Sequence, residues 1–96
     1  MEEKYLKLLE EQINLFFKYA DAEKEKSIDI HYWGTPPNME CGVVIFEQTI
    51  KEGDNVKEKL QLLSTKVEAL SYFNVEDRYL QMSSDNPENV AFTIFL

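Results

Sequence analysis

The 96 residues of the chain have a mass of 11.3 kDa; 44% are hydrophobic and 29% are charged, with three glycines and three prolines. This composition is typical of one compact globular domain over residues 1–96 and excludes a disordered or fibrous chain. The formal net charge of −8 excludes nonspecific nucleic-acid binding, which needs a basic surface, and disfavours attachment to anionic lipid.

The first predicted element is a helix over residues 2–26. At about 100° per residue, its apolar side chains fill an arc of about 200°. A helix that covers one face of a small sheet needs an apolar stripe of roughly 100° or somewhat more. We expect the surplus apolar surface to contact a second helix or a second molecule, and residues 21–26 to form a solvated last turn.

Residues 27–50 predict a β-hairpin. The segment 27–33 alternates with a period of two, residues 34–38 (GTPPN) form a turn, and a second strand follows at 41–50. A hairpin that is symmetric about Pro37 has these opposed pairs: Trp33 and Cys41, His31 and Val43, and Asp29 and Ile45. A slip by one residue would turn the side chains of the second strand to the other face.

The second half of the chain repeats the plan of a helix followed by a hairpin. Residues 51–55 form a loop in which Asn55 and Glu58 approximate a capping box, and a helix runs from Val56 to near Asn74. Strands follow at 78–83 and 90–96, joined by a turn at 84–89. The order of elements is therefore αββαββ.

This order predicts an α+β fold, a four-stranded antiparallel sheet with two helices packed on one face. The alternation assigns one set of side chains to the face that the helices cover. That set is Ile28, Ile30, Tyr32, Val44, Phe46, Leu80, Met82, Val90, Phe92, Ile94 and Leu96.

The other face of the predicted sheet is more apolar than a solvated face should be. Its predicted members are Trp33, Cys41, Val43, Ile45, Tyr79 and Phe95, with Asp29, His31, Gln81 and Thr93 between them. An exposed apolar surface of this kind is typical of an interface, and Trp and Tyr are enriched at binding hot spots. The alternative is that a loop or part of the first helix covers these groups.

The two predicted hairpins hold most of the net negative charge. Residues 27–50 contain no Lys or Arg, and residues 75–96 contain only Arg78. The acidic side chains of the hairpins are Asp29, Glu40, Glu47, Glu76, Asp77, Asp85 and Glu88. They predict either a soluble surface or a patch that steers the protein onto a basic partner.

Catalytic and metal-binding patterns are weak. Cys41, His31 and Asp29 share one face of the predicted hairpin, but a flat sheet face encloses no substrate and offers no oxyanion hole. One His and one Cys cannot complete a zinc site, and no calcium-loop spacing is present. We therefore expect no enzyme activity, no metal and no cofactor.

The single cysteine also bears on the compartment. Small secreted domains usually hold several disulfides, and Cys41 cannot form one within the chain. The charged start MEEKYLKLLEEQ does not resemble a signal peptide, and no apolar run is long enough to span a membrane. These features predict a cytoplasmic protein.

The sequence thus predicts a small acidic protein, not an enzyme, that binds a basic-surfaced macromolecule, most simply a protein, as an inhibitor of the immunity or phage counter-defence type. The predicted partner-binding residues are Trp33, His31, Asp29, Tyr79, Phe95, Glu40 and Glu47. The first alternative is a homodimer that holds a small molecule or nucleotide between its sheet faces. A lesser alternative is an enzyme that uses Cys41 and His31.

Overall fold

A computed structural model describes residues 1–19, 27–70, 76–84 and 92–96, with the backbone alone for Glu76 and Phe92. The elements are α1 (Glu3–Tyr19), β1 (Ser27–Thr35), β2 (Val43–Lys51), α2 (Val56–Leu70), β3 (Glu76–Ser83) and β4 (Phe92–Phe95). The predicted αββαββ order and the α+β class are confirmed. The predicted last turn at 21–26, the end of the second helix beyond Leu70, most of the turn at 84–89, and Val90 lie outside the described residues.

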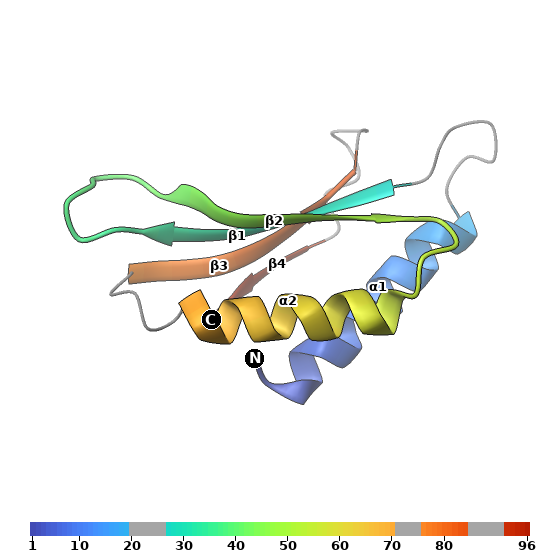
Figure 1. Ribbon diagram of the computed structural model, residues 1–96. Coiled ribbons are helices and arrows are strands. Elements are labelled where there is room, and N and C mark those ends of the chain that lie inside the picture. Colours follow the sequence, from blue (N-terminus) through green and yellow to red (C-terminus); the bar gives the residue numbers. More distant parts are fainter. Residues whose placement is uncertain (20–26, 71–75, 85–91) are drawn as a thin grey trace.

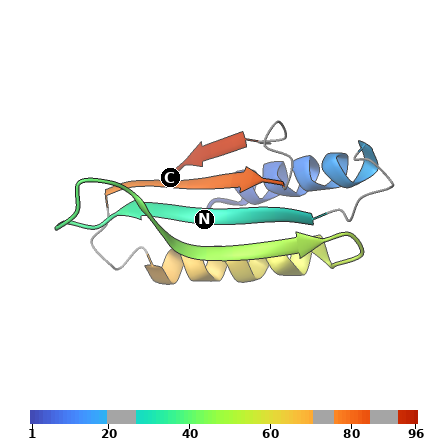
Figure 2. The ribbon, with the colours of Figure 1, turned by 90° about the horizontal axis from the view of Figure 1, so that it is seen from above.

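The four strands form one antiparallel sheet in the order β2-β1-β3-β4. Both helices lie on the same face of this sheet, as Figure 1 shows. Figure 2 looks onto the opposite face, with both helices behind the strands. Within the described part of the chain, no helix covers this second face, which we call the open face.

The core lies between the helices and the sheet because one face of each element is apolar. Alternate residues of β1 are buried, and Ile30 and Tyr32 are fully inaccessible. The helices contribute Leu9, Ile13, Leu60, Leu63 and Val67, and the other strands contribute Ile50, Leu80, Met82 and Ile94. This arrangement puts the even-numbered residues of β1 in the core and its odd-numbered residues on the open face.

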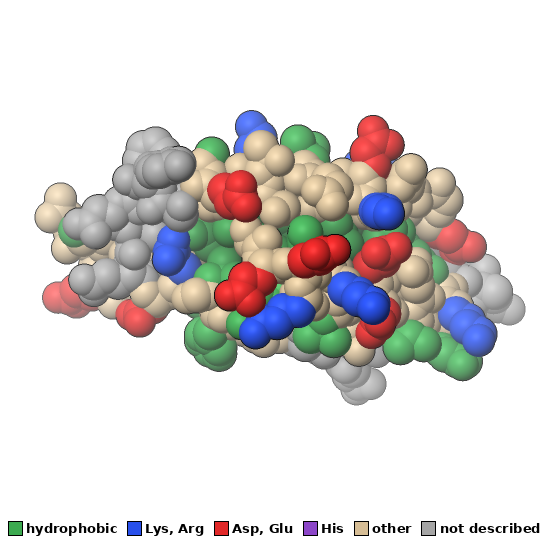
Figure 3. Space-filling view, turned by 90° about the horizontal axis from the view of Figure 1, so that it is seen from below, with side chains coloured by type: hydrophobic (Ala, Val, Ile, Leu, Met, Phe, Trp, Pro, Cys, Tyr) green, Lys and Arg blue, Asp and Glu red, His purple; other side chains and the backbone are tan. Residues whose placement is uncertain are grey.

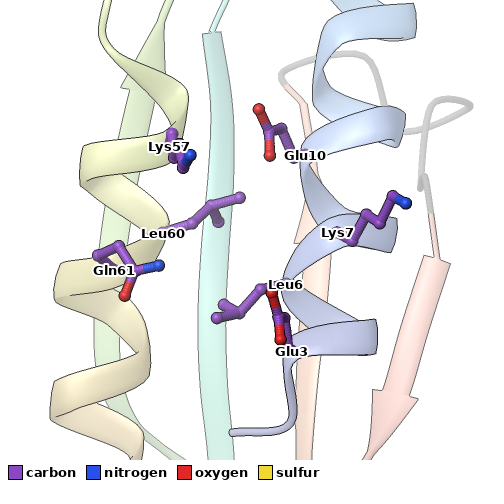
Figure 4. A pocket seen from close by; sticks show the side chains of 7 residues that line it. All are labelled: Glu3, Leu6, Lys7, Glu10, Lys57, Leu60 and Gln61. Atoms are coloured by element: carbon purple, nitrogen blue, oxygen red, sulfur yellow. The ribbon is translucent and has the colours of Figure 1, made fainter.

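The wide apolar arc of α1 is only partly covered. Leu9 and Ile13 are buried, and Leu6 points toward Leu60 of the antiparallel helix α2 (Figure 4). Three other apolar side chains of this helix are exposed: Leu8, Leu15 and Tyr19. The second helix therefore covers part of the surplus that the sequence predicts, and the rest faces solvent.

The start of α2 follows the predicted cap. The Glu58 backbone N–H donates to Asn55 Oδ1 at 3.1 Å, which satisfies one of the unpaired donors of the first turn. The Lys51 backbone N–H donates to Asp54 Oδ2 at 2.9 Å and closes the preceding turn. Gly53 has φ of 92°, a conformation that glycine adopts without strain.

The predicted register of the first hairpin is wrong. In the structure Trp33 lies opposite Val44, His31 opposite Glu47, and Asp29 opposite Thr49. The hairpin is centred near Met39 and not at Pro37, because β1 continues to Thr35 and β2 begins only at Val43. The register also shifts between Tyr32 and Trp33, where β2 inserts Ile45 as an extra residue.

This register corrects four predicted positions in the second strand. Val44, predicted in the core, lies opposite Trp33 and is 40% exposed. Ile45, predicted on the open face, packs against the core. Val43 lies opposite buried Gly34 and so points away from the open face, while Cys41 lies outside the strand.

The end of the last strand also differs in detail. Leu96, predicted to be on the core face, follows β4 and is 38% exposed. It lines a shallow pocket on the helix side with Met1, Tyr5 and Arg78.

We expect Ile13→Ala to lower the free energy of unfolding by about 2–5 kcal/mol, because it leaves a cavity in the core. Leu15→Ala, on the exposed side of the same helix, should change it by about 0.5 kcal/mol or less. Urea unfolding followed by circular dichroism measures both. Equal losses would contradict the orientation of α1.

Candidate functional site

A row of apolar side chains crosses all four strands of the open face. Val44 of β2 lies opposite Trp33 of β1, Trp33 lies opposite Tyr79 of β3, and Tyr79 lies opposite Phe95 of β4. We call these four residues the apolar row. The structure therefore brings together the three aromatic residues that the sequence predicts on this face.

The rings of the apolar row contact one another. Those of Trp33 and Tyr79 are stacked, 5.9 Å between centroids with 7° between planes. The Tyr79 and Phe95 rings are 5.8 Å apart and tilted by 46°. Mutual packing leaves Trp33 and Tyr79 half-buried, whereas Phe95 on the edge strand is 75% exposed. Stacked and tilted rings present a stiff apolar surface that loses little side-chain entropy on binding.

The indole of Trp33 is held from several sides. A side-chain carbon on Gly42 would lie 3.9 Å from Trp33 Cε3, so the backbone of the turn approaches the ring closely. The His31 ring lies 6.3 Å from it on the same strand. The indole Nε1 of Trp33 is buried and has no hydrogen-bond partner among the described residues.

A second row, parallel to the first, is polar. It consists of Glu47, His31, Gln81 and Thr93, which are paired across the strands in that order. His31 Nε2 lies 3.6 Å from Glu47 Oε2. The Glu47 side chain is 74% exposed and that of His31 23%. We call these four residues the polar row; Glu47 is its accessible charge.

Asp29 lies one step further along β1. Its Oδ1 accepts a hydrogen bond of 2.7 Å from Thr49 Oγ1 on β2, and Ser83 of β3 is its neighbour on the other side. The bond fixes the carboxylate on the open face beside the polar row. Asp29 and Glu47 are thus on the same face as the apolar row.

The other predicted acidic residues are less closely associated with the two rows. Glu40 is exposed in the turn between β1 and β2. Asp77 is exposed in β3, with φ of 51°. Glu76 pairs with Thr35 through the backbone. Asp85 and Glu88 lie outside the described residues.

The two faces of the molecule differ in charge. Apart from Lys51 and Arg78, every described Lys or Arg lies on one of the two helices. There, basic and acidic side chains interleave, as Figure 3 shows for the helix side. Two of these basic side chains have acidic neighbours: Lys59 Nζ lies 3.7 Å from Asp54 Oδ2, and Lys4 donates a hydrogen bond to Glu2. The hydrogen bond to Glu2 raises the pKa of Lys4. Arg78 lines the pocket on the helix side, whereas Lys51, opposite Ser27 at the end of β2, lies on the open face. Glu47 and Asp29 lie nearer to the apolar row than Lys51 does.

The pair needed for Cys–His chemistry is not formed. The predicted register would have placed Cys41 diagonally across from His31, but His31 lies opposite Glu47, and Cys41 is exposed in the turn before β2. In the described part of the chain, no group of three His, Cys, Asp or Glu side chains is arranged to hold a metal ion. None of the described helices is both long and apolar enough to cross a membrane.

The groove between the helices is the main alternative site (Figure 4). It has a volume of about 310 Å³, with Leu6 and Leu60 on its floor and Glu10 and Lys57 on opposite walls. Charges of both signs with an apolar floor are ordinary for two amphipathic helices that pack on a sheet. The groove therefore lacks the separation into an apolar row and a polar row that distinguishes the open face.

Sequence reasoning missed Val44 as a member of this surface. The run VVIF at 43–46 has no alternation of apolar and polar residues, so the inserted residue Ile45 leaves no trace in the pattern. Thr49, the partner of Asp29, was missed for the same reason, since its position follows from the register.

Comparisons of this chain with protein-family models, with curated proteins and with solved structures find no match.

We expect Trp33 and Tyr79 to be energetically coupled. In a double-mutant cycle of Trp33→Ala and Tyr79→Ala, the coupling energy in urea unfolding should be about 0.5–1.5 kcal/mol, because the rings stack. A cycle of Tyr79→Ala with Leu62→Ala, on the opposite side of the molecule, should give a coupling within about 0.5 kcal/mol of zero. Equal coupling in the two cycles would argue against a stacked pair.

Proposed function

We propose that this chain is a cytoplasmic, non-enzymatic inhibitor that binds a basic protein surface through the open face of its sheet. The apolar row supplies the area that is desolvated on binding. Glu47 and Asp29, and Glu40 in the adjoining turn, supply the charge that steers the encounter. A function as an immunity or counter-defence protein fits an inhibitor of this size and charge.

The observation that carries the proposal is the exposed apolar row, with the carboxylates of Glu47 and Asp29 on the same face of the sheet. Phe95 is 75% exposed and Val44 is 40% exposed, on a chain with net charge −8. An apolar centre with a charged rim is the usual anatomy of a specific interface. Charge on such a rim acts mainly on the rate and selectivity of association.

The sign of the charge favours a protein partner over nucleic acid or lipid. Phosphate groups would be repelled by Glu47 and Asp29, and the basic side chains on the helices have acidic neighbours. An acidic surface of this kind can occupy a basic groove that normally receives an anionic substrate. Inhibition then follows from occlusion, and it requires no chemistry from this chain.

A homodimer through the open faces is the second candidate. The exposed apolar row favours it, since a second copy would cover Phe95 and Val44. Against it, the contact would bring two sets of Glu47 and Asp29 together, and like charges across an interface cost free energy. We therefore place the binding of a foreign basic protein first.

Trp33→Ala should weaken binding to the partner by about 2–4 kcal/mol, since it removes the centre of the apolar row. Phe95→Ser, at an exposed position, tests the same surface with little risk to folding. The measurement is isothermal titration calorimetry with a basic protein that co-purifies with the tagged chain from its native cell. Leu62→Ser, 51% exposed on α2, is the matched control and should leave the affinity unchanged. Unchanged affinity in both open-face variants would reject this face as the binding site.

Size-exclusion chromatography with light scattering should give a monomer at about 100 μM, because self-association through the open face opposes like charges. A dimer that Phe95→Ser dissociates and Leu62→Ser does not would favour the second candidate instead.

A further inference from the structure

We infer that the partner meets the open face with a basic amphipathic helix laid across the strands. The inference rests on the proposed function and specifies which element of the partner docks. It comes from the arrangement of the open face in two parallel rows, one apolar and one polar. Each row crosses the sheet from β2 to β4.

The dimensions of the two rows match those of a helix. Strands lie about 4.8 Å apart, so each row is about 14 Å long, and the rows are separated by two residues, or about 7 Å. A helix rises about 1.5 Å per residue, so about ten residues span a row. Its apolar residues at i, i+3 or i+4, and i+7 recur at a spacing close to that of the strands.

A helix can also contact both rows at once. On a helix about 10–12 Å in diameter, two stripes of side chains roughly 80° apart are separated by about 7 Å. One stripe can therefore lie on the apolar row while the other reaches the polar row. An extended strand laid across the sheet presents one line of side chains to it, since its alternate residues point away.

The charge of the polar row sets the charge of the second stripe. Its accessible ionised group is the Glu47 carboxylate, with His31 3.6 Å away and Asp29 one step further along β1. Gln81 and Thr93 on the remaining strands are uncharged. A helix with Leu or Phe along one stripe and Lys or Arg along the adjacent stripe is therefore complementary to this face.

Three synthetic peptides of about 18 residues test the inference, all with one composition of Leu, Ala, Lys and Gln. The first has the helical period with an adjacent Lys stripe, the second alternates with a period of two, and the third is scrambled. Binding is followed by the emission of Trp33, the only tryptophan of the chain. The helicity of the peptide is followed by circular dichroism.

We expect the helical-pattern peptide to bind about tenfold more tightly than the other two and to gain helicity when it binds. Glu47→Gln should weaken its binding about two- to fivefold, whereas Glu11→Gln, which removes the same charge from α1, should leave it unchanged. Phe95→Ser should weaken it, and Leu62→Ser should not.

Other results would overturn the inference in distinguishable ways. Equal or tighter binding of the alternating peptide would identify a strand as the docking element. Equal binding of the scrambled peptide would show that the charge of the peptide alone accounts for its binding. Either result leaves the proposed function standing. Equal effects of Glu47→Gln and Glu11→Gln on the affinity would show that the peptide does not bind specifically at the open face. Failure of all three peptides to bind would count against the basic partner as well.

Discussion

The pairing of β1 between β2 and β3 is the constraint on which the rest of the structure depends. This strand has two neighbours and alternate residues that are fully buried, so its register cannot slip without moving Ile30 and Tyr32 out of the core. The same alternation turns His31 and Trp33 to the open face. Burial on one side of the strand therefore fixes the composition of the surface on the other side.

The open face is unusual because its apolar and charged groups are separated into rows. A random mixture of the same side chains would satisfy solubility equally well. Register with β2 and β3 places Trp33 beside Val44 and Tyr79, and His31 beside Glu47 and Gln81. The two rows arise because segments that are distant in the sequence pair in this register. The face therefore presents an apolar side and a polar side to a partner.

Most of the fold could be predicted from the sequence, since period-two alternation in 27–33 and the cap at Asn55 are local signals with local causes. The shared face of Trp33, Tyr79 and Phe95 followed from the same alternation. The register of the first hairpin could not be predicted, because the length of the turn and the insertion of Ile45 depend on how β2 packs against the core. The position of Val44 depends on that register and so could not be predicted either.

The bulge at Ile45 has a consequence for the outer edge of the sheet. β2 is an edge strand of nine residues, and a flat apolar edge of that length is a template for unwanted pairing with other chains. The inserted residue interrupts the regular spacing of backbone donors and acceptors and increases the local twist. Glu47 and Lys51 add charge along the same strand. The inserted residue, which leaves no trace in the sequence pattern, therefore makes this edge a poorer template for pairing with another chain, although Val44 beside it stays exposed.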